Sequence, residues 1–307
     1  MIVVVCPGQG SQTPGFLAPW LELDGAREHL AAFSEASGVD LIAHGTTSDA
    51  DTIRDTAIAQ PLIVAASVVA WSALSHEAGS ARPGGVAGHS VGEVAALIAA
   101  GVVSAADGMR LVGERGRAMA EAAAVEATGM SAVIGGDRDA VLARLAELDL
   151  TPANHNGAGQ IVAAGAREPL AALAAEPVAG TRVIPLQVAG AFHTRYMLPA
   201  VERLRSAASG VAVSAPELTL WTNRDGTVVT DGATALDLLV GQVANPVRWD
   251  LCMASFAEHG VTGIIELTPA GTLTGLAKRA LRGVPSVAVK TPDDLAAATA
   301  LLTGEAA

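Results

Sequence analysis

Aromatic residues, cysteine and lysine are scarce in this chain, and each shortage excludes a class of protein. Phe, Tyr and Trp make up 3% of the residues, so the core has to consist of aliphatic side chains. The two cysteines, Cys6 and Cys252, are too few for a disulfide scaffold and indicate a reducing cytoplasm. With two lysines and a net charge of −12, the chain lacks the overall basic character of a nucleic-acid-binding protein.

Long uninterrupted apolar runs are also lacking. No run reaches the roughly eighteen residues typical of a transmembrane helix, and the first residues lack the basic segment of a signal peptide. We therefore expect a soluble protein that does not act at a membrane. Half of the 307 residues are hydrophobic, which is enough for one large domain or a domain with an insertion, and which excludes disorder.

Strand-like and helix-like segments alternate over most of the chain. The pattern predicts strands at 2–6, 85–87, 218–223 and 263–267, and helices at 26–35, 59–78, 93–100, 107–124, 198–208, 233–243, 249–259 and 273–281. Such alternation favours a mostly parallel sheet with helices on both faces. We therefore predict an α/β fold with an α/β-hydrolase-like large subdomain.

The pattern changes in the middle of the chain. Strands are expected at 130–134, 151–154, 160–164 and 181–188, and helices at 138–148 and 167–175. This β-α-β-β-α-β order is typical of a ferredoxin-like fold. We therefore assign residues 126–190 to an inserted ferredoxin-like small subdomain, and residues 1–125 and 191–307 to the catalytic subdomain.

The segment Gly88-His89-Ser90-Val91-Gly92 fits the pattern G-x-S-x-G between a strand and a helix. Glycines on both sides of the serine permit a strained turn from which Oγ projects. The N–H groups at the start of the following helix then point at a developing oxyanion. The motif predicts Ser90 as a nucleophile, and the alternative is a structural Gly-Ser turn.

A serine nucleophile needs a base, and His193 is the strongest of seven histidine candidates. It ends an apolar, glycine-containing approach at 188–193, which a surface histidine would not need. His89 adjoins the serine but is expected to point the other way. Most of the remaining histidines resemble ordinary surface residues: His29, His44, His76 and His259.

Several further motifs accompany the serine turn. They are PGQGSQ at 7–12, GHSVGE at 88–93, LVGERGRAM around Arg115, NHNGAGQ at 154–160, GAFH at 190–193, QVANPVRW at 242–249 and TPAGTLTGLAKRA near the end. Together they run collinearly from the first strand to about residue 292. The sequence resembles the malonyl-CoA:acyl carrier protein transacylases, acyltransferases of fatty acid and polyketide synthesis.

The resemblance implies a role for each matching residue. Ser90 would be the acylated nucleophile and His193 its base. The other roles would be oxyanion stabilisation by the backbone N–H groups of Gln9 and Val91, binding of the malonyl carboxylate by Arg115, support by the polar side chain of Asn156, and orientation of His193 by the main-chain carbonyl of Gln242. A ping-pong transfer from malonyl-CoA to holo acyl carrier protein would supply extender units for fatty acid or polyketide synthesis. No bound cofactor, metal, nucleic acid or membrane is implied, and we expect a cytoplasmic monomer.

Some assignments leave alternatives open. By spacing alone, Arg115 belongs to a solvated helix face, whereas a buried guanidinium would offer a carboxylate two parallel donors. Asn154 and Asn156 alternate, so on a strand they face the same side. No acidic third member of a triad is apparent, and a carbonyl can fix the imidazole tautomer without repelling a malonyl carboxylate. Phe192 either limits space beside the base or is only core.

The sequence leaves two rival functions open. One is a serine thioesterase or esterase with water as the acceptor, which the Arg115 segment and the absence of a late Asp-then-His order disfavour. The other is a catalytically silent docking module, which the intact serine and histidine disfavour. A carrier protein is usually acidic, so we expect it to dock on a local basic patch. Lys278, Arg279 and Arg282 cluster on the late helix, and Arg182 and Arg195 flank His193 in the sequence. The alternative is a solvated helix end whose cations suit the helix dipole.

Overall fold

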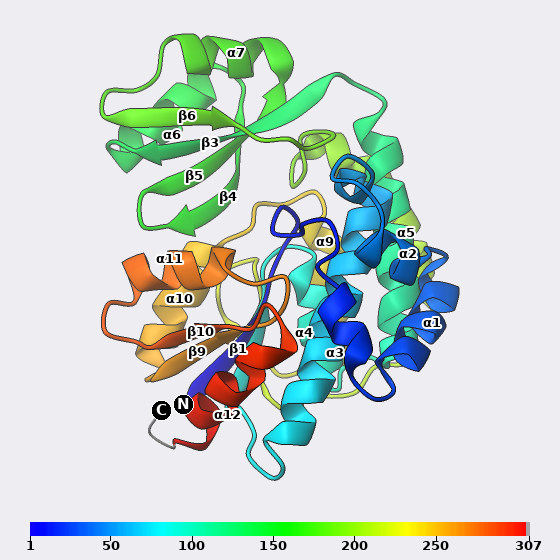
Figure 1. Ribbon diagram of the computed structural model, residues 1–307. Coiled ribbons are helices and arrows are strands. Elements are labelled where there is room, and N and C mark those ends of the chain that lie inside the picture. Colours follow the sequence, from blue (N-terminus) through cyan, green and yellow to red (C-terminus); the bar gives the residue numbers. More distant parts are fainter. Residues whose placement is uncertain (305–307) are drawn as a thin grey trace.

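Two sheets divide the protein into two subdomains in the computed structural model, which describes residues 1–304 (Figure 1). The large subdomain carries both termini, and the small one lies above it in the view. One sheet is mostly parallel and the other is antiparallel. The predicted α/β fold with a second, ferredoxin-like subdomain is therefore confirmed. The boundaries at residues 126 and 190 stay a prediction.

The large subdomain is built on a six-stranded sheet. Across the sheet the order is β10 (Ser286–Ala288), β9 (Gly263–Glu266), β1 (Ile2–Cys6), β2 (Gly85–Gly88), β7 (Thr219–Trp221) and β8 (Val228–Val229). All neighbours are parallel except β7 and β8. The apolar residues of β1 are almost fully buried near the centre, as expected for a strand covered on both faces. The edge strands β8 and β10 were not predicted.

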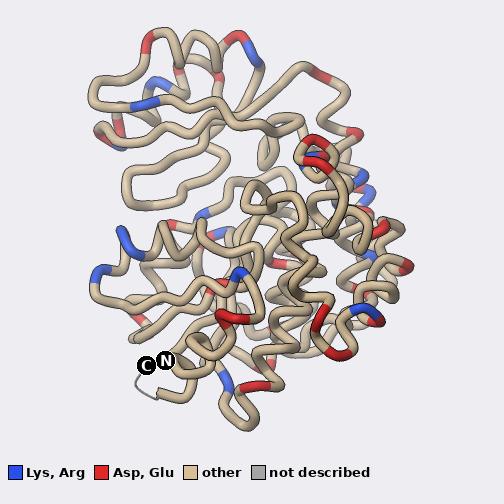
Figure 2. Tube along the Cα trace, viewed as in Figure 1, with Lys and Arg blue, Asp and Glu red and all other residues tan. Residues whose placement is uncertain are grey.

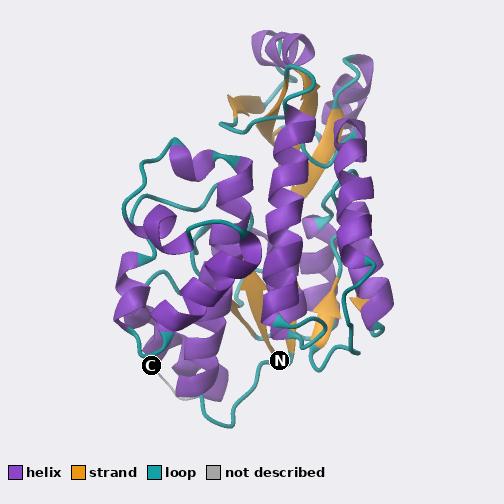
Figure 3. Ribbon diagram, turned by 90° about the vertical axis from the view of Figure 1, so that its right-hand side faces the viewer, coloured by secondary structure: helices purple, strands orange, loops and turns teal. Residues whose placement is uncertain are grey.

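Helices cover both faces of this sheet (Figure 3). The helices of the large subdomain are α1 (Ala26–Ser37), α2 (Leu41–Thr46), α3 (Thr56–Glu77), α4 (Gly92–Ala99), α5 (Ala105–Ala123), α8 (Leu198–Ala208), α9 (Gly232–Gln242), α10 (Trp249–Glu258), α11 (Thr272–Ala280) and α12 (Leu295–Thr303). The large subdomain also contains short 3-10 helices: η1 (Ala18–Glu22), η2 (Thr52–Arg54), η3 (Arg195–Met197) and η4 (Pro292–Asp294).

The long helices α3 and α5 pack against each other beside the sheet. Each begins before its predicted first residue because a side chain caps it: Asp55 accepts from Ala57 N at 2.8 Å, and Ser104 accepts from Asp107 N at 3.0 Å. By length and composition α3 could cross a membrane, but 72% of its most apolar window is buried inside the protein. That burial identifies α3 as a core helix.

The small subdomain has a four-stranded antiparallel sheet. Its strands lie in the order β4 (Thr151–Gly157), β5 (Gln160–Ala166), β3 (Thr128–Gly135) and β6 (Thr181–Pro185), with helices α6 (Arg138–Glu147) and α7 (Arg167–Ala175). Its own apolar core includes Val133, Leu145 and Leu173. The last strand ends at Pro185, three residues before its predicted end, because the chain leaves the sheet there toward the large subdomain.

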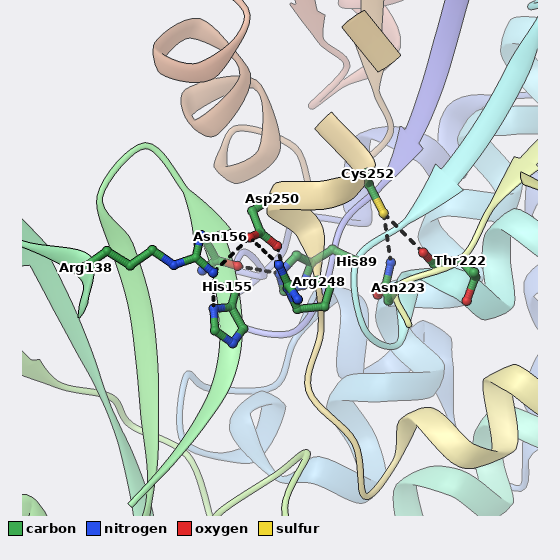
Figure 4. A network of polar contacts seen from close by, with 9 residues as sticks. All are labelled: His89, Arg138, His155, Asn156, Thr222, Asn223, Arg248, Asp250 and Cys252. Atoms are coloured by element: carbon green, nitrogen blue, oxygen red, sulfur yellow. Dashed lines mark hydrogen bonds and ion pairs between the residues drawn. The ribbon is translucent and has the colours of Figure 1, made fainter. Parts of the chain in front are cut away.

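Strand β4 ties the two subdomains together. His155 N donates to Val247 O, and Val247 N donates to Ala153 O, both at 2.9 Å. Arg138 reaches from the small subdomain to Asp250 at 3.5 Å, and Asp250 also accepts two hydrogen bonds from Arg248 at 2.9 Å (Figure 4). These contacts fix the position of the small subdomain next to the end of β2.

Candidate active site

Ser90 lies at the tip of a strained turn between β2 and α4. Its φ of 53° is in the left-handed region, which costs about 1–3 kcal/mol for a residue other than glycine. A Cβ on Gly88 would lie 2.0 Å from the carbonyl carbon of Gly92, and one on Gly92 would lie 2.2 Å from the oxygen of Cys6. Both glycines are therefore required by sterics, and the turn has the shape that the motif predicts.

Asn223, two residues after the end of β7, holds this turn. Its Oδ1 accepts from Ser90 N at 2.7 Å, and its Nδ2 donates to Gly88 O at 2.7 Å. The N–H of Ser90 is therefore already occupied. Among residues 1–304, the backbone N–H groups of Gln9 and Val91 have no hydrogen-bond acceptor, and both residues line the cavity into which Ser90 points.

His193 contacts the serine from the other side of the cavity. Its Nε2 lies 2.7 Å from Ser90 Oγ, and its Nδ1 lies 2.8 Å from the main-chain oxygen of Gln242. A carbonyl only accepts, so Nδ1 carries the proton and Nε2 is free to accept one from the serine. Burial, assisted by the charge of Arg115, lowers the pKa of His193 to about 3. The imidazole is therefore neutral at physiological pH.

Arg115 points inward from α5 and is 1% exposed, so the solvated-face alternative is wrong. Its Nη1 donates to Gln60 Oε1 at 2.6 Å, and its Nη2 donates to Gln242 Oε1 at 2.9 Å. Within residues 1–304 its Nε is buried without a partner. Burial lowers the pKa of the guanidinium to about 10, and the nearby Glu93 opposes that shift. Arg115 thus stays cationic at neutral pH.

The side chain of Gln242 connects this cation to a buried carboxylate. Its Nε2 donates to Glu93 Oε2, to Ser90 O at 3.1 Å and to Asn223 Oδ1 at 3.2 Å. Glu93 Oε1 accepts from Asn223 N at 2.6 Å. Burial raises the pKa of Glu93 to about 8, although the Asn223 N–H and the charge of Arg115 act in the opposite direction. Gln242 therefore contacts the turn of Ser90, the His193 ring and the Arg115 guanidinium together.

One cavity of about 270 Å³ brings the predicted site residues together. Its walls include Gln9, Ser90, Val91, Arg115, Asn156, Phe192 and His193. Gln242 lies behind this wall and is 5% exposed. A buried cation beside a serine–histidine pair can bind an acyl group that carries its own carboxylate.

The polar residues of β4 alternate as predicted. Asn154 and Asn156 both line the active-site cavity, whereas His155 lines a separate cavity of about 140 Å³. The expectation for His89 was only partly right. Its ring makes no hydrogen bond to Ser90, but it lines the same cavity and its Nε2 lies 2.9 Å from Asn156 Oδ1 (Figure 4).

Three site residues were not predicted from the sequence: Gln60, Glu93 and Asn223. The first two have a recognisable signal, because each is a polar residue at the start of an otherwise apolar helical run. Asn223 lies two residues after β7, at the last position of the predicted strand 218–223, where a side chain reaches the same sheet edge as the serine turn. Each accepts a hydrogen bond from another residue of the site: Gln60 from Arg115, Glu93 from Gln242 and Asn223 from Ser90.

The five predicted basic residues lie on different elements. Lys278 and Arg279 are exposed on the last turn of α11, and Arg282 is exposed just beyond it. Figure 2 shows where Lys and Arg positions, in blue, lie along the chain. Arg182, by contrast, lies on β6, at the edge of the small sheet opposite the β4 edge that adjoins the large subdomain. Arg195 ion-pairs with Asp149 at 2.6 Å. Arg182 therefore lies away from the α11 cluster, and the charge of Arg195 is already paired.

Comparison with known proteins identifies the family. The acyl transferase domain model matches residues 3–298. The malonyl CoA-acyl carrier protein transacylase of Mycobacterium tuberculosis is 55% identical over 296 residues, which are 96% of this chain and 98% of that protein. The crystal structure of MCAT from Mycobacterium tuberculosis, also 55% identical, has a TM-score of 0.93 and covers 96% of this chain and 98% of that one.

A further solved structure contains a partner. It is a malonyl-transacylase in complex with its type II PKS acyl-carrier protein, at 32% identity and a TM-score of 0.89, covering 99% of both chains. These matches span nearly the whole chain and agree with the motifs and with the cavity that those motifs line. The chain therefore belongs to the acyl transferase family, in the group of the malonyl CoA-acyl carrier protein transacylases.

Proposed function

We propose that this enzyme transfers the malonyl group of malonyl-CoA to the phosphopantetheine thiol of holo acyl carrier protein. The transfer is ping-pong and passes through a malonyl ester of Ser90. The observation that carries this proposal is the buried Arg115 guanidinium in the cavity of the Ser90–His193 pair. An esterase for neutral acyl groups has no use for a buried cation there.

In the first half-reaction His193 accepts the hydroxyl proton of Ser90 while Oγ attacks the thioester carbonyl. The short distance of 2.7 Å and the neutral imidazole suit this step. The tetrahedral oxyanion is held by the free N–H groups of Gln9 and Val91, both of which border the cavity. His193 then returns the proton to the leaving CoA thiolate.

In the second half-reaction the carrier's thiol takes the place of CoA. His193 removes its proton, the thiolate attacks the malonyl ester, and Ser90 Oγ leaves with that proton. The main-chain oxygen of Gln242 keeps His193 in the same tautomer throughout, because Nδ1 remains bonded to it at 2.8 Å. Since every step is reversible, the net direction of malonyl transfer depends on the concentrations of the two thioesters and of the two free thiols.

Arg115 binds the malonyl carboxylate in both half-reactions. Its Nε has no hydrogen-bond partner within residues 1–304, so the carboxylate supplies an acceptor to a buried donor that otherwise lacks one. The pairing also affects the base. The charge of Arg115 lowers the pKa of His193, and a bound carboxylate offsets that charge. His193 therefore becomes a stronger base when a carboxyacyl group is bound.

Asn156 and Phe192 complete the proposed substrate contacts. Asn156 is 7% exposed and joins His89 to Gln160, which keeps polar groups fixed in the cavity wall. Phe192 is 6% exposed, borders the cavity and precedes the base directly. We assign Asn156 a supporting polar role and Phe192 a steric one.

The proposed setting follows from the same features. All reacting groups come from one chain, which suits a monomer, and the proposed steps use protein groups without a bound cofactor. Cys6 and Cys252 are buried free thiols, as in a protein of the reducing cytoplasm. The malonyl-carrier product serves as an extender unit for fatty acid or polyketide synthesis.

Mass spectrometry of both proteins tests the proposal. The enzyme incubated with malonyl-CoA should gain one malonyl group, and holo acyl carrier protein added afterwards should remove it. Ser90→Ala should gain none, because the attacking oxygen is missing. The control Ser206→Ala, at an exposed position on α8, should be acylated normally. An acyl-enzyme that releases only free malonate would instead indicate a thioesterase.

A further inference from the structure

We propose that Glu93 is the counter-charge of Arg115 in the empty site and takes up a proton from water when the malonyl carboxylate binds. This inference rests on the proposed function, because it assumes that Arg115 receives that carboxylate. Glu93 acts through Gln242 and does not touch the substrate. It is therefore a positioning residue that adjusts the charge of the clamp.

The contacts connect the two charges through one amide. Arg115 and Glu93 are 1% and 6% exposed, so neither charge is solvated. The oxygen of the Gln242 amide faces Arg115 at 2.9 Å, and its nitrogen donates to Glu93. The negative end of the amide dipole therefore faces the cation and its positive end faces the carboxylate. This arrangement is favourable only while Arg115 is a hydrogen-bond donor and Glu93 is an acceptor.

The hydrogen bonds of Glu93 are those of an ionised carboxylate. Its Oε1 accepts from Asn223 N at 2.6 Å, and its Oε2 accepts from Gln242. A carboxylic acid would instead use one oxygen as a donor. The other titratable group facing it is the Cys252 thiol on α10, which burial keeps neutral by raising its pKa above the usual range. When Glu93 is ionised in the empty site, Arg115 is thus the cation that balances it.

Glu93 lies on the far side of the catalytic groups from the substrate. It lines a separate small cavity of about 10 Å³ with Leu97, Thr222 and Leu239, and it does not line the active-site cavity. A malonyl carboxylate therefore reaches Arg115 from the opposite side. Two buried carboxylates then share one guanidinium, and burial of the uncompensated second charge is unfavourable.

Protonation of Glu93 resolves this conflict at small cost. Its pKa is about 8 with Arg115 nearby, and it rises further when the malonyl carboxylate takes up the charge of Arg115. The group is thus partly ionised in the empty site near pH 8 and neutral in the complex. Malonyl binding is linked to uptake of a proton, whereas binding of an uncharged acyl group is not.

Calorimetric titration of Ser90→Ala measures this uptake without acyl transfer. Malonyl-CoA is titrated at pH 8 in two buffers of different ionisation enthalpy, and acetyl-CoA serves as the ligand without a carboxylate. With a pKa of about 8, roughly half a proton should be taken up per malonyl-CoA, and none with acetyl-CoA. Ser90→Ala/Glu93→Gln should lose the uptake.

Glu114→Gln in the Ser90→Ala background is the matched control. Glu114 precedes Arg115 on α5 but pairs outward with Arg117 and Arg203, so the uptake should persist. A second measurement uses Glu93→Gln with Ser90 intact. Between pH 7 and pH 9 the wild-type KM for malonyl-CoA should rise about tenfold, and that of Glu93→Gln should stay flat. A merely structural defect would raise KM at every pH.

The outcomes separate the two proposals. The role of Glu93 would be overturned if no proton is taken up when Glu93 is intact, or if Glu93→Gln leaves the proton uptake unchanged. Either result would count even if Ser90 is malonylated normally. This calorimetric result stands even if the Glu93→Gln protein is unstable. If malonyl-CoA binds Ser90→Ala no more tightly than acetyl-CoA, the carboxylate clamp of the proposed function fails instead.

Discussion

Replacing Arg115 with alanine separates recognition of the malonyl carboxylate from the chemistry of acyl transfer. The guanidinium is 1% exposed and forms part of the cavity wall. Its removal takes away the cation and leaves the amide oxygens of Gln60 and Gln242 without their donor. Malonyl-CoA therefore loses a buried partner for its carboxylate, whereas acetyl-CoA has no carboxylate to be affected.

The size of the effect follows from the burial of this pair. Removing one partner of a buried, hydrogen-bonded charge pair costs about 2–5 kcal/mol. At about 1.4 kcal/mol for each factor of ten, kcat/KM for malonyl-CoA should fall from about 30-fold to several thousand-fold. The malonyl-to-acetyl ratio should fall by a similar factor, because acetyl transfer does not use this pair.

The base should remain functional in Arg115→Ala. Burial is the main reason that the pKa of His193 lies near 3, and the charge of Arg115 is the second. Loss of that charge raises the pKa of His193 toward its ordinary value, so its proton-accepting form is lost only at acidic pH. At pH 8 His193 stays neutral in both proteins, and the acid limb of acetyl transfer should move to higher pH.

Single-turnover acylation by malonyl-CoA and acetyl-CoA at pH 8 measures the ratio. Arg110→Ala is the matched control, since its side chain on the same helix is 61% exposed and pairs only with Asp107 among residues 1–304. It should leave both rates unchanged. An unchanged malonyl-to-acetyl ratio in folded Arg115→Ala, or equal loss of both rates, would refute the clamp.

Two further predictions concern the acyl group and the carrier. Phe192→Ser should narrow the preference for malonyl over methylmalonyl, because one methyl group in a pocket is worth about 1–3 kcal/mol, or roughly 10- to 200-fold in kcat/KM; equal loss with both substrates would leave Phe192 as packing alone. Reversing the charges of Lys278 and Arg279 should raise the apparent KM for acyl carrier protein and spare acylation by malonyl-CoA. Equal effects on the two half-reactions would reject α11 as the docking site.

Local sequence was sufficient for much of the fold. The β-branched run of β1 and the alternation of strands and helices predicted the mostly parallel sheet, and the change of pattern after residue 126 predicted the antiparallel one. The errors have local causes. Strands β8 and β10 are two and three residues long, too short for any period to be visible. Helix α3 begins early because Asp55 caps it, a signal that hydrophobic periodicity does not contain.

By itself the sequence determined the turn that carries Ser90. Gly88 and Gly92 are imposed by contacts of the turn with itself and with the end of β1, so the motif predicts the conformation that exposes Ser90. Spacing could not decide the direction of Arg115, since Arg110 and Arg117 on the same helix point outward. That choice was made by the packing of α5 against α3, which encloses the guanidinium beside Gln60.

Only the tertiary structure decided how the charges are arranged. Glu93, Arg115 and Gln242 are far apart in the sequence, and no local pattern relates them. They meet because the first turn of α4 and the last turn of α9 converge with α5 behind the sheet edge that carries Ser90. Burial there leaves each charge without water, so each must find its partner in the protein, and this requirement places one glutamine between them.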